Sequence, residues 1–349
     1  MKPFIFFILI GFLFYSCGNN VSKEDTNQRN YSGIESFPMH TIKLELLNTN
    51  NELMTPRKIW VNDSLIIIQD GGHSEGFLSF YNRHTGNFIK GYGSIGEGPE
   101  DYILPRCVKI GDVIVIYSIV NEPSYLLLNN ISTINIQKEK KSLNQSLLES
   151  SYLFPINDTM VISCANLSKE AQFLIQSNND IIINNKFPDY FGDKVSDINL
   201  VTKVFDAFYD IIPSKDNILV AYKYYPIVDI ISIPDFKIQR TFFEEKQKNM
   251  YRVNNNGVAE FDNPLLKYTF SYCTNQCAYL LYQNSTNEDL RERKTNPEIH
   301  VFDWNGNFIK RLLLDRPAYN IAVSDNDDEL YVLSLDENLD PQIYKSKLY

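Results

Sequence analysis

The chain contains 349 residues, of which 44% are hydrophobic and 13% aromatic, and its formal net charge is −10. This composition supplies enough apolar material for a folded core, and it excludes a collagen-like, coiled-coil or wholly disordered chain. The acidic charge is not offset by a basic block, which argues against a nucleic-acid partner because phosphate binding needs grouped Lys and Arg side chains.

The first sixteen residues have the features of an export signal. Lys2 gives a positive start, and the apolar run Phe4–Phe14 follows it. That run is shorter than the ~20 residues of a membrane-spanning helix, and it matches the core of a signal peptide. We therefore predict a signal peptide over residues 1–16.

Cys17 stands directly after this segment, preceded by the small residue Ser16. The arrangement resembles a bacterial lipobox, whose cysteine is acylated and becomes the new N-terminus. Such acyl chains would anchor the protein to a membrane. Gly18 differs from the Asp that favours inner-membrane retention, so we expect a cell-envelope protein of the outer membrane, its periplasmic or exterior side left open. The alternative is an ordinary secretory signal with an incidental cysteine.

Polar, aperiodic residues follow, and we predict a flexible, lipidated tether over residues 17–38 and a folded body over residues 39–349. In the body, apolar and polar residues alternate, or short apolar runs rich in β-branched and aromatic residues occur. Turn residues separate these segments, which indicates an all-β fold. Helical periodicity is confined to two short stretches, Lys141–Ser150 and Lys194–Tyr209. The clearest predicted strands are Ser64–Gln69, Gly76–Tyr81, Asp112–Tyr117 and Asp216–Tyr222.

The body also repeats. Gly-Asn-Phe-Ile-Lys occurs at residues 86–90 and again at 306–310, each time between two apolar runs, as in a hairpin. An Asp- or Asn-containing turn precedes an apolar strand five times, roughly 50 residues apart except for a last gap of about twice that length. The turns contain Asp63, Asp112, Asp158, Asp216 and Asp328.

The long gap predicts one degenerate copy near Tyr268–Tyr282, which makes six units. We therefore predict a six-bladed β-propeller, since radial repetition of blades protects the sheet edges. Two β-sandwiches are the rival, although no linker is evident near the midpoint. The alternating segment Thr41–Leu46 is expected to close the ring by joining the last blade, which ends with Gln342–Leu348.

A family resemblance can be named at Gly91–Tyr102, which contains Gly91, Gly93, Gly96, Gly98 and Pro99. This segment resembles the glycine-proline-aromatic signature of the TolB-like six-bladed propeller lipoproteins of the Bacteroides group. The stretch from Ile299 to Val332 is similar to the last two blades of that family. The resemblance implies the propeller fold and export, and it brings no catalytic residues.

The same glycines satisfy the Gly-x-Gly-x-x-Gly spacing of dinucleotide-binding loops. That motif works between a strand and a helix, and no helix pattern follows here, so no nucleotide cofactor is expected. The glycines suit a loop that crosses between blades. If this loop lines the central opening, its residues Gly91, Gly93, Gly96, Gly98 and Pro99 are the candidate ligand-facing surface.

Few other residues form a recognisable chemical motif. No His or Cys spacing predicts a metal site, and no nucleophile motif is present. Cys273 and Cys277 lie at an expected hairpin and are candidates for a disulfide. The acidic run 325–329 suits a solvated turn, with Ca²⁺ binding as the alternative. Ser64 and Thr159 stand in Asp-Ser/Thr-aliphatic tripeptides that resemble O-glycosylation sites of exported proteins.

These observations favour a lipid-anchored propeller that binds or scaffolds a protein, peptide or glycan without chemistry and without a cofactor. The alternative is a hydrolase or lyase that acts on extracellular glycan or lactone with a metal at the ring centre. Carboxylates or histidines converging from three or more blades would favour the enzyme, and an apolar plug in the channel would exclude it.

Overall fold

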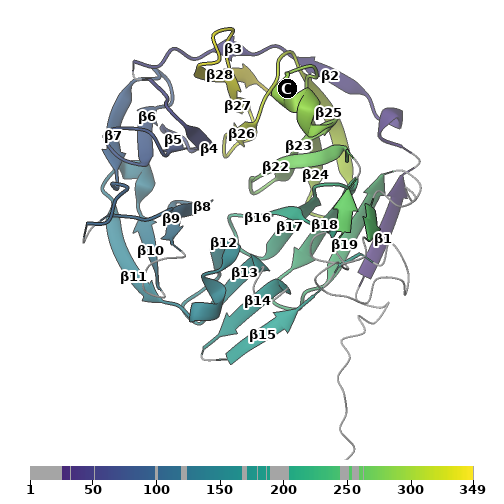
Figure 1. Cartoon of the computed structure of the whole chain (residues 1–349), viewed down its shortest axis with the longest axis horizontal. Helices are drawn as coiled ribbons and strands as arrows, with labels where there is room; N and C mark the ends of the chain where they lie inside the picture. The colour runs from purple at the N-terminus through teal and green to yellow at the C-terminus, as the bar shows by residue number, and fades with distance from the viewer. Residues whose placement is uncertain are drawn as a thin grey trace, which may run out of the picture.

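The computed structural model describes residues 26–348 except 32, 51, 99–100, 119–123, 167–170, 179, 186, 189–203, 244–250, 254–258 and 262. Six sheets of four or five strands surround a common centre (Figure 1), which confirms the six-bladed β-propeller. The signal peptide, Cys17 and Pro99 lie outside the described residues. Within the described residues, no helix combines the length and apolar content needed to cross a bilayer.

The first three blades are each built from four consecutive strands. Blade 1 contains β4 (Pro56–Val61), β5 (Leu65–Asp70), β6 (Leu78–Asn82) and β7 (Phe88–Tyr92). Blade 2 contains β8 (Arg106–Ile110), β9 (Val113–Tyr117), β10 (Ser124–Asn129) and β11 (Gln137–Ser142). Blade 3 contains β12 (Ser150–Pro155), β13 (Met160–Asn166), β14 (Ala171–Ser177) and β15 (Asp180–Asn184).

The last three blades take strands from the N-terminal segment as well. Blade 4 contains β16 (Ala207–Ile211), β17 (Asn217–Tyr222), β18 (Ile227–Ser232), β19 (Ile238–Phe243) and β1 (Thr26–Tyr31). Blade 5 contains β22 (Leu266–Cys273), β23 (Cys277–Ser285), β24 (Glu298–Asp303), β25 (Phe308–Leu314) and β2 (Met39–Ile42). Blade 6 contains β26 (Asn320–Val323), β27 (Glu329–Leu335), β28 (Pro341–Lys347) and β3 (Glu45–Leu46).

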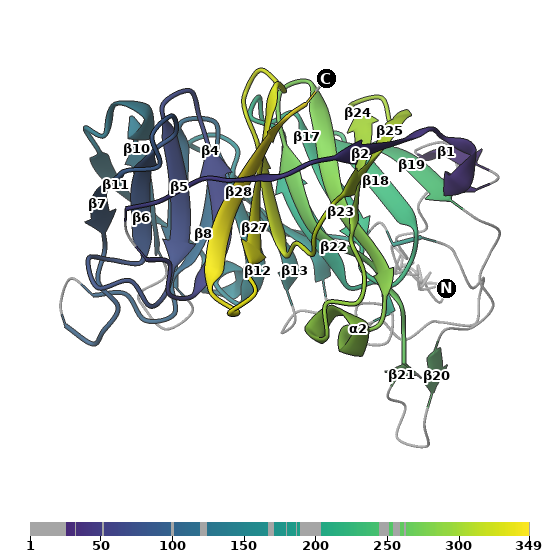
Figure 2. The same cartoon turned by 90° about the horizontal axis from the view of Figure 1, so that it is seen from above.

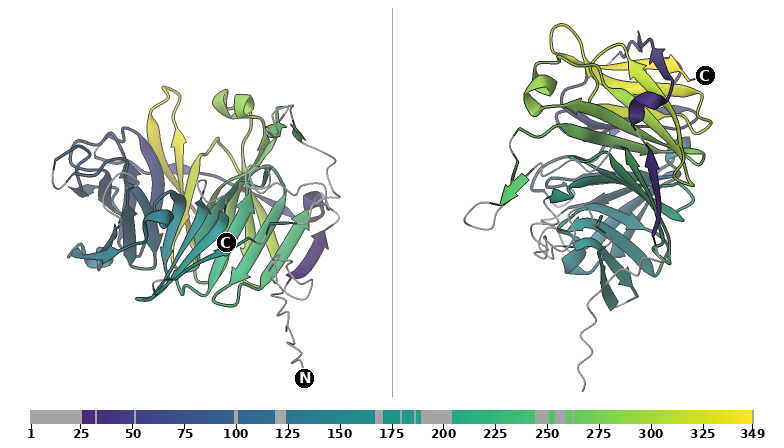
Figure 3. Two further views of the ribbon diagram at one scale, coloured as in Figure 1. Left: turned by 60° about the horizontal axis from the view of Figure 1, so that its bottom comes forward. Right: turned by 90° about the vertical axis from the view of Figure 1, so that its right-hand side faces the viewer.

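The N-terminal segment forms a belt, here defined as β1, β2 and β3, along the outer edges of blades 4, 5 and 6 (Figures 1 and 3). β1 pairs in parallel with β19, and β2 pairs in parallel with β25. β3 pairs antiparallel with β28, which confirms that an N-terminal strand closes the last blade. Residues 26–31, assigned to the tether in the sequence analysis, are therefore the first strand of the belt.

The Asp- and Asn-containing turns join the first and second strands of their blades, as the repeat predicted. Asn62 shows the physical reason, because its side-chain oxygen accepts the backbone N–H groups of Ser64 at 3.1 Å and Leu65 at 2.8 Å. Asn157 does the same for Thr159 and Met160. The degenerate copy near Tyr268–Tyr282 is the β22–β23 hairpin of blade 5. The two Gly-Asn-Phe-Ile-Lys segments connect third and fourth strands, in blades 1 and 5.

Because successive strands of a blade run in opposite directions, their connections lie alternately on the two faces of the ring. The turn face carries the first-to-second strand turns, and the crossover face carries the links between blades. The hairpin of β20 (Tyr251–Val253) with β21 (Ala259–Phe261) and helix α2 (Asn287–Arg291) lie together on the crossover face (Figure 2). The described residues also form three single 3₁₀ turns, η2 (Ile34–Ser36), η3 (Ile131–Thr133) and η4 (Gln145–Leu147).

One helical expectation is corrected, because Lys141–Ser150 contains only the 3₁₀ turn η4 between the ends of β11 and β12. Most of Lys194–Tyr209 lies outside the described residues; its first described residue, Val204, is helical, and strand β16 begins at Ala207. The buried core lies between neighbouring blades, where apolar side chains from both faces of each sheet pack. β5 is the clearest case, since all six of its residues are buried.

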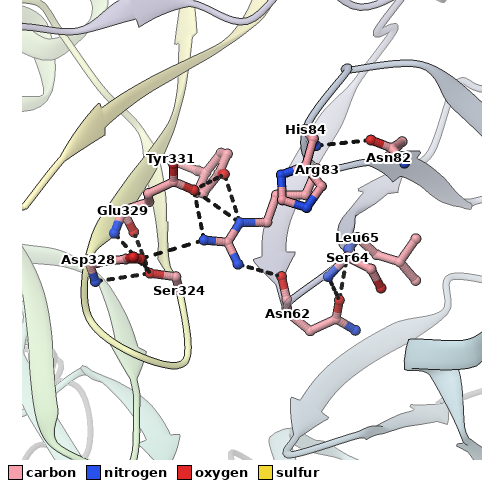
Figure 4. A network of polar contacts seen from close by, with 10 residues as sticks. All are labelled: Asn62, Ser64, Leu65, Asn82, Arg83, His84, Ser324, Asp328, Glu329 and Tyr331. Carbon is pink, nitrogen blue, oxygen red and sulfur yellow. Dashed lines mark hydrogen bonds and ion pairs between the residues drawn. The ribbon is translucent and has the colours of Figure 1, made fainter.

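Arg83 joins the first blade to the last (Figure 4). Its guanidinium donates to the Glu329 carboxylate at 2.7 Å, to the Tyr331 hydroxyl at 2.9 Å and to the Asn62 carbonyl at 3.0 Å. The pKa of Arg83 is raised because these bonds outweigh the effect of burial. The ring is thus closed twice, by the β3–β28 pairing and by this side-chain network.

Candidate functional site

The first strands of all six blades line a central cavity of about 260 Å³, called the channel below. Charged side chains enter it from blades 1, 2, 4 and 6, and half-buried aromatic rings enter it from blades 3 to 6. The charged group comprises Arg57, Lys58, Lys109, Asp210 and Asp325. The aromatic group comprises Tyr152, Phe208, Phe270 and Tyr319.

β16 shows how the strands position these side chains. Its residues alternate between buried and half-buried, so Phe208 and Asp210 share the channel side while Tyr209 packs in the core. Asp210 accepts a hydrogen bond from the backbone N–H of Ile211 at 2.8 Å and another from the Cys273 thiol. Burial raises the pKa of Asp210 to about 7, so this carboxyl titrates near neutral pH.

Lys58 is held firmly from three blades. Its Nζ donates to the backbone carbonyl of Cys107 at 2.9 Å and lies 6.0 Å from the Trp60 ring centre and 5.7 Å from the Tyr152 ring centre. These are cation–π distances. Burial lowers the pKa of Lys58, and the charge of Asp210 opposes that shift.

Lys109 enters the channel from β8. Burial lowers its pKa as well, against the opposing charges of Asp325, Asp112 and Asp210. Within the described part of the chain, its ammonium makes no hydrogen bond and no ion pair. The channel thus brings two ammonium groups close to one carboxyl that burial keeps partly protonated.

The two candidate disulfide cysteines differ in their surroundings. Cys273 lies in the channel beside Asp210, whereas Cys277 is affected by Asp327, Lys310 and Asp303. Both are free thiols in the structure. Burial raises the pKa of Cys277 to about 11 and holds that of Cys273 well above its ordinary value. Neither environment favours a thiolate.

The acidic run 325–329 is divided among separate contacts. Asp327 accepts hydrogen bonds from Thr274 and Tyr279, both at 2.8 Å, and Asp328 accepts one from Ser324 at 2.7 Å. Glu329 pairs with Arg83, and Asp325 lines the channel. Among the described residues, no group of three His, Cys, Asp or Glu side chains is arranged to hold a metal ion.

The glycine loop lies elsewhere. Gly91, Gly93 and Gly98 line a second hollow of about 1040 Å³, between the end of blade 1 and the outer strands of blade 2. The loop crosses between blades, as the glycines indicated, and it does not line the channel. At Gly93 the backbone φ of +72° and the Phe77 ring, 2.3 Å from a Cβ built there, both require glycine.

Asp101 also lines this hollow, and Gly96 lies beside it. A Cβ on Gly96 would be only 2.4 Å from the Asp101 carboxylate. This carboxylate accepts bonds from Gly98 N–H at 2.9 Å and from the Ser94 hydroxyl at 2.5 Å. The glycines therefore fold the loop tightly on itself. Ser64 and Thr159, the predicted glycosylation sites, are both exposed on the turn face.

The channel residues were not found from the sequence, because they are spread over six strands with no linear motif. One signal was present. Lys58, Lys109 and Asp210 each stand in a predicted strand a few residues before a repeated Asp/Asn turn. A charge at that place in three of the repeats indicates an inward-facing position on the first strand of a blade.

Comparison with known proteins agrees with this architecture. The family model described as TolB-like 6-blade propeller-like matches residues 37–326. A solved structure of an exported protein from Bacteroides fragilis NCTC 9343 is similar, with a TM-score of 0.53 and 13% identity, covering 93% of this chain and 99% of that chain. A DUF4221 family member from Bacteroides vulgatus gives a TM-score of 0.55 at 10% identity, covering 89% of this chain and 97% of that chain.

At these identities the two structures establish the fold alone, and no curated protein matches the chain. The family match covers most of the chain, and the six blades agree with it. The chain belongs to the TolB-like six-bladed propeller family.

Proposed function

We propose that the chain is an exported binding module, anchored in the cell envelope through a lipid on Cys17, that takes its ligand into the channel without chemistry. Its partner would be a protein, peptide or glycan that inserts one chemical group into the channel. The observation that carries this proposal is the convergence of Lys58, Lys109 and Asp210, together with four half-buried aromatic rings, on one cavity. Pockets of this composition are typical of ligand sites.

Export and anchoring rest on the N-terminal sequence, and the exported relative from Bacteroides fragilis supports them. The test is the intact mass of the protein purified from its own membranes, before and after lipase treatment. A mass that begins at Cys17 with lipase-sensitive acyl chains supports the anchor, and Cys17→Ala should then release the protein from the membrane. A lipid-free mass would contradict the anchor and leave a secreted binder.

The alternative, an enzyme with a central metal, does not fit the channel. Its candidate donors are Asp210, Cys273 and Asp325, and the ammonium groups of Lys58 and Lys109 would repel a cation there. Metal ligands are deprotonated, whereas burial raises the pKa of both Asp210 and Cys273. The channel chemistry therefore favours an anion over a metal ion.

A further inference from the structure

The channel ammonium groups lack the carboxylate partner that four other described lysines have. Lys141, Lys223, Lys237 and Lys294 each lie within 3.4 Å of a carboxylate oxygen. In the described residues no carboxylate lies within ion-pair distance of Lys58 or Lys109, although both are half-buried. Charges withdrawn from water without a counter-ion are costly, and they are retained where a ligand supplies the counter-ion.

Lys58 is also preorganised. The bond to the Cys107 carbonyl uses one of its three N–H donors, and the rings of Trp60 and Tyr152 restrict its position. The remaining donors are available to an anion in the channel. A donor fixed before binding loses little conformational entropy when the ligand arrives.

Asp210 changes the net charge of the channel with pH, and Arg57 and Asp325 contribute charge there as well. Its carboxyl faces Lys58 from β4, Lys109 from β8, Tyr152 from β12, and Tyr272 and Cys273 from β22. Because burial raises its pKa to about 7, it is largely protonated in mildly acidic solution and can then donate a hydrogen bond. At higher pH its charge opposes an incoming anion.

The size and walls of the channel limit the rest of the ligand. A volume of about 260 Å³ equals that of roughly nine water molecules at ~30 Å³ each, which is enough for a small organic acid. The half-buried rings of Tyr152, Phe208, Phe270 and Tyr319 offer apolar faces to a flat or pyranose ring. One six-membered ring with one carboxylate fills this space.

We infer that the channel binds a six-membered ring that bears a carboxylate, with Lys58 and Lys109 on the carboxylate and the aromatic side chains on the ring. This inference rests on the proposed function, since it names the chemistry of the group that the channel would take. Sugar acids and aromatic acids share that chemistry. Affinity should fall as pH rises from 6 to 8, because Asp210 becomes charged, and deprotonation of either lysine would act in the same direction.

The experiment is calorimetric titration of the full mature chain at pH 6 with matched probes. D-glucuronate is compared with D-glucose, and benzoate with benzamide, so that each acid is tested against an uncharged ring. We expect one acid to bind at least tenfold more tightly than its uncharged match. Lys58→Met and Lys109→Met should each weaken that acid about tenfold, which corresponds to 1.4 kcal/mol.

Lys138→Met and Lys140→Met, in the hollow beside the glycine loop, are the matched controls and should change nothing. Asp210→Asn should keep binding and remove the part of the decline between pH 6 and 8 that comes from the Asp210 charge, and retained binding also shows that a channel variant still folds. The inference is overturned if neither acid exceeds its uncharged match, or if the Lys58 and Lys109 variants bind like the controls.

These failures can be told apart from failure of the proposed function. If an uncharged ring binds and Tyr319→Ala abolishes its binding, the channel remains the ligand site. Only the inference that the ligand bears a carboxylate then fails. If none of the four probes binds and all variants keep the partner of the wild-type protein, both proposals fall.

Discussion

Blade 4 and the channel both contain buried charged side chains, but among the described residues the charges are paired in blade 4 and lack an ion pair in the channel. In blade 4, Arg240 donates to Asp229 at 2.6 and 2.7 Å, and Tyr222 donates to Asp229 at 2.9 Å. Burial alone would lower the pKa of Arg240, but the Asp229 carboxylate outweighs it and the net shift is upward. In the channel, Lys58 and Lys109 keep lowered pKa values. A satisfied network holds strands together, whereas unpaired charges stay available to a ligand.

The largest effect is expected where a satisfied charge is broken. Arg240→Met leaves the fully buried Asp229 without its cation, so the free energy of unfolding should fall by about 3–5 kcal/mol. Urea denaturation measures this. The control is Lys237→Met, because the Lys237–Asp235 pair is exposed at the surface and should contribute less than about 1 kcal/mol. Equal losses in the two variants would contradict the contrast.

A smaller, pH-dependent effect is expected for Asp210→Asn. The carboxyl has a pKa of about 7 in the folded protein against 3.8 as the ordinary value, so the folded state binds its proton more tightly. The wild type should therefore lose stability as pH rises from about 4 to 7, and the variant should not. The stability difference should change by about 2 kcal/mol over that range, after allowance for solvent screening.

Urea midpoints of both proteins at pH 4, 5, 6, 7 and 8 test this prediction. Above pH 8 the difference should level off, because Asp210 is then ionised in both the folded and the unfolded state. A difference that stays constant across the series would show that Asp210 titrates normally, and the channel would then differ less from blade 4 than the geometry indicates.

The ring closure should give an intermediate result. Glu329 pairs with Arg83 at 2.7 Å, but its side chain is 25% exposed, so Glu329→Gln should cost about 1 kcal/mol. A double-mutant cycle with Arg83→Met isolates the coupling between the two side chains. A coupling near zero would mean that the β3–β28 pairing closes the ring unaided.

The smallest effect is expected for Lys109→Met. Its ammonium has no hydrogen bond to lose among the described residues, so stability should stay within about 0.5 kcal/mol or rise slightly. Thermal unfolding of the variant and the wild type at pH 7 measures this difference in stability. Lys58→Met is the comparison, since it loses the bond to Cys107 and should cost about 1 kcal/mol. A large loss for Lys109→Met would indicate a structural role.

The sequence was sufficient to predict the blades but not the channel. The Asp/Asn turns and the two Gly-Asn-Phe-Ile-Lys hairpins are local, and short-range hydrogen bonds such as those of Asn62 and Asn157 fix them. Six such units imply a ring. The channel depends instead on which first-strand residues face inward, and Lys58 and Asp210 stand about 150 residues apart in the chain.

The glycine loop is the reverse case, because the sequence suggested a ligand-facing surface where the structure has none in the channel. Its spacing is conspicuous, yet the glycines serve the backbone: Gly93 avoids the Phe77 ring and Gly96 avoids the Asp101 carboxylate. Sequence cannot separate a glycine that clears space for a ligand from one that clears space for the chain itself. Closure was predicted correctly in outline, but Thr41–Leu46 divides between β2 on blade 5 and β3 on blade 6.

The belt has a consequence for how the protein is made. Residues 26–46 are synthesised before their partner strands β19, β25 and β28, which stand about 200 to 300 residues later in the chain. Contacts of such sequence separation make folding slow. The ring can therefore close only after strand β28 has been synthesised.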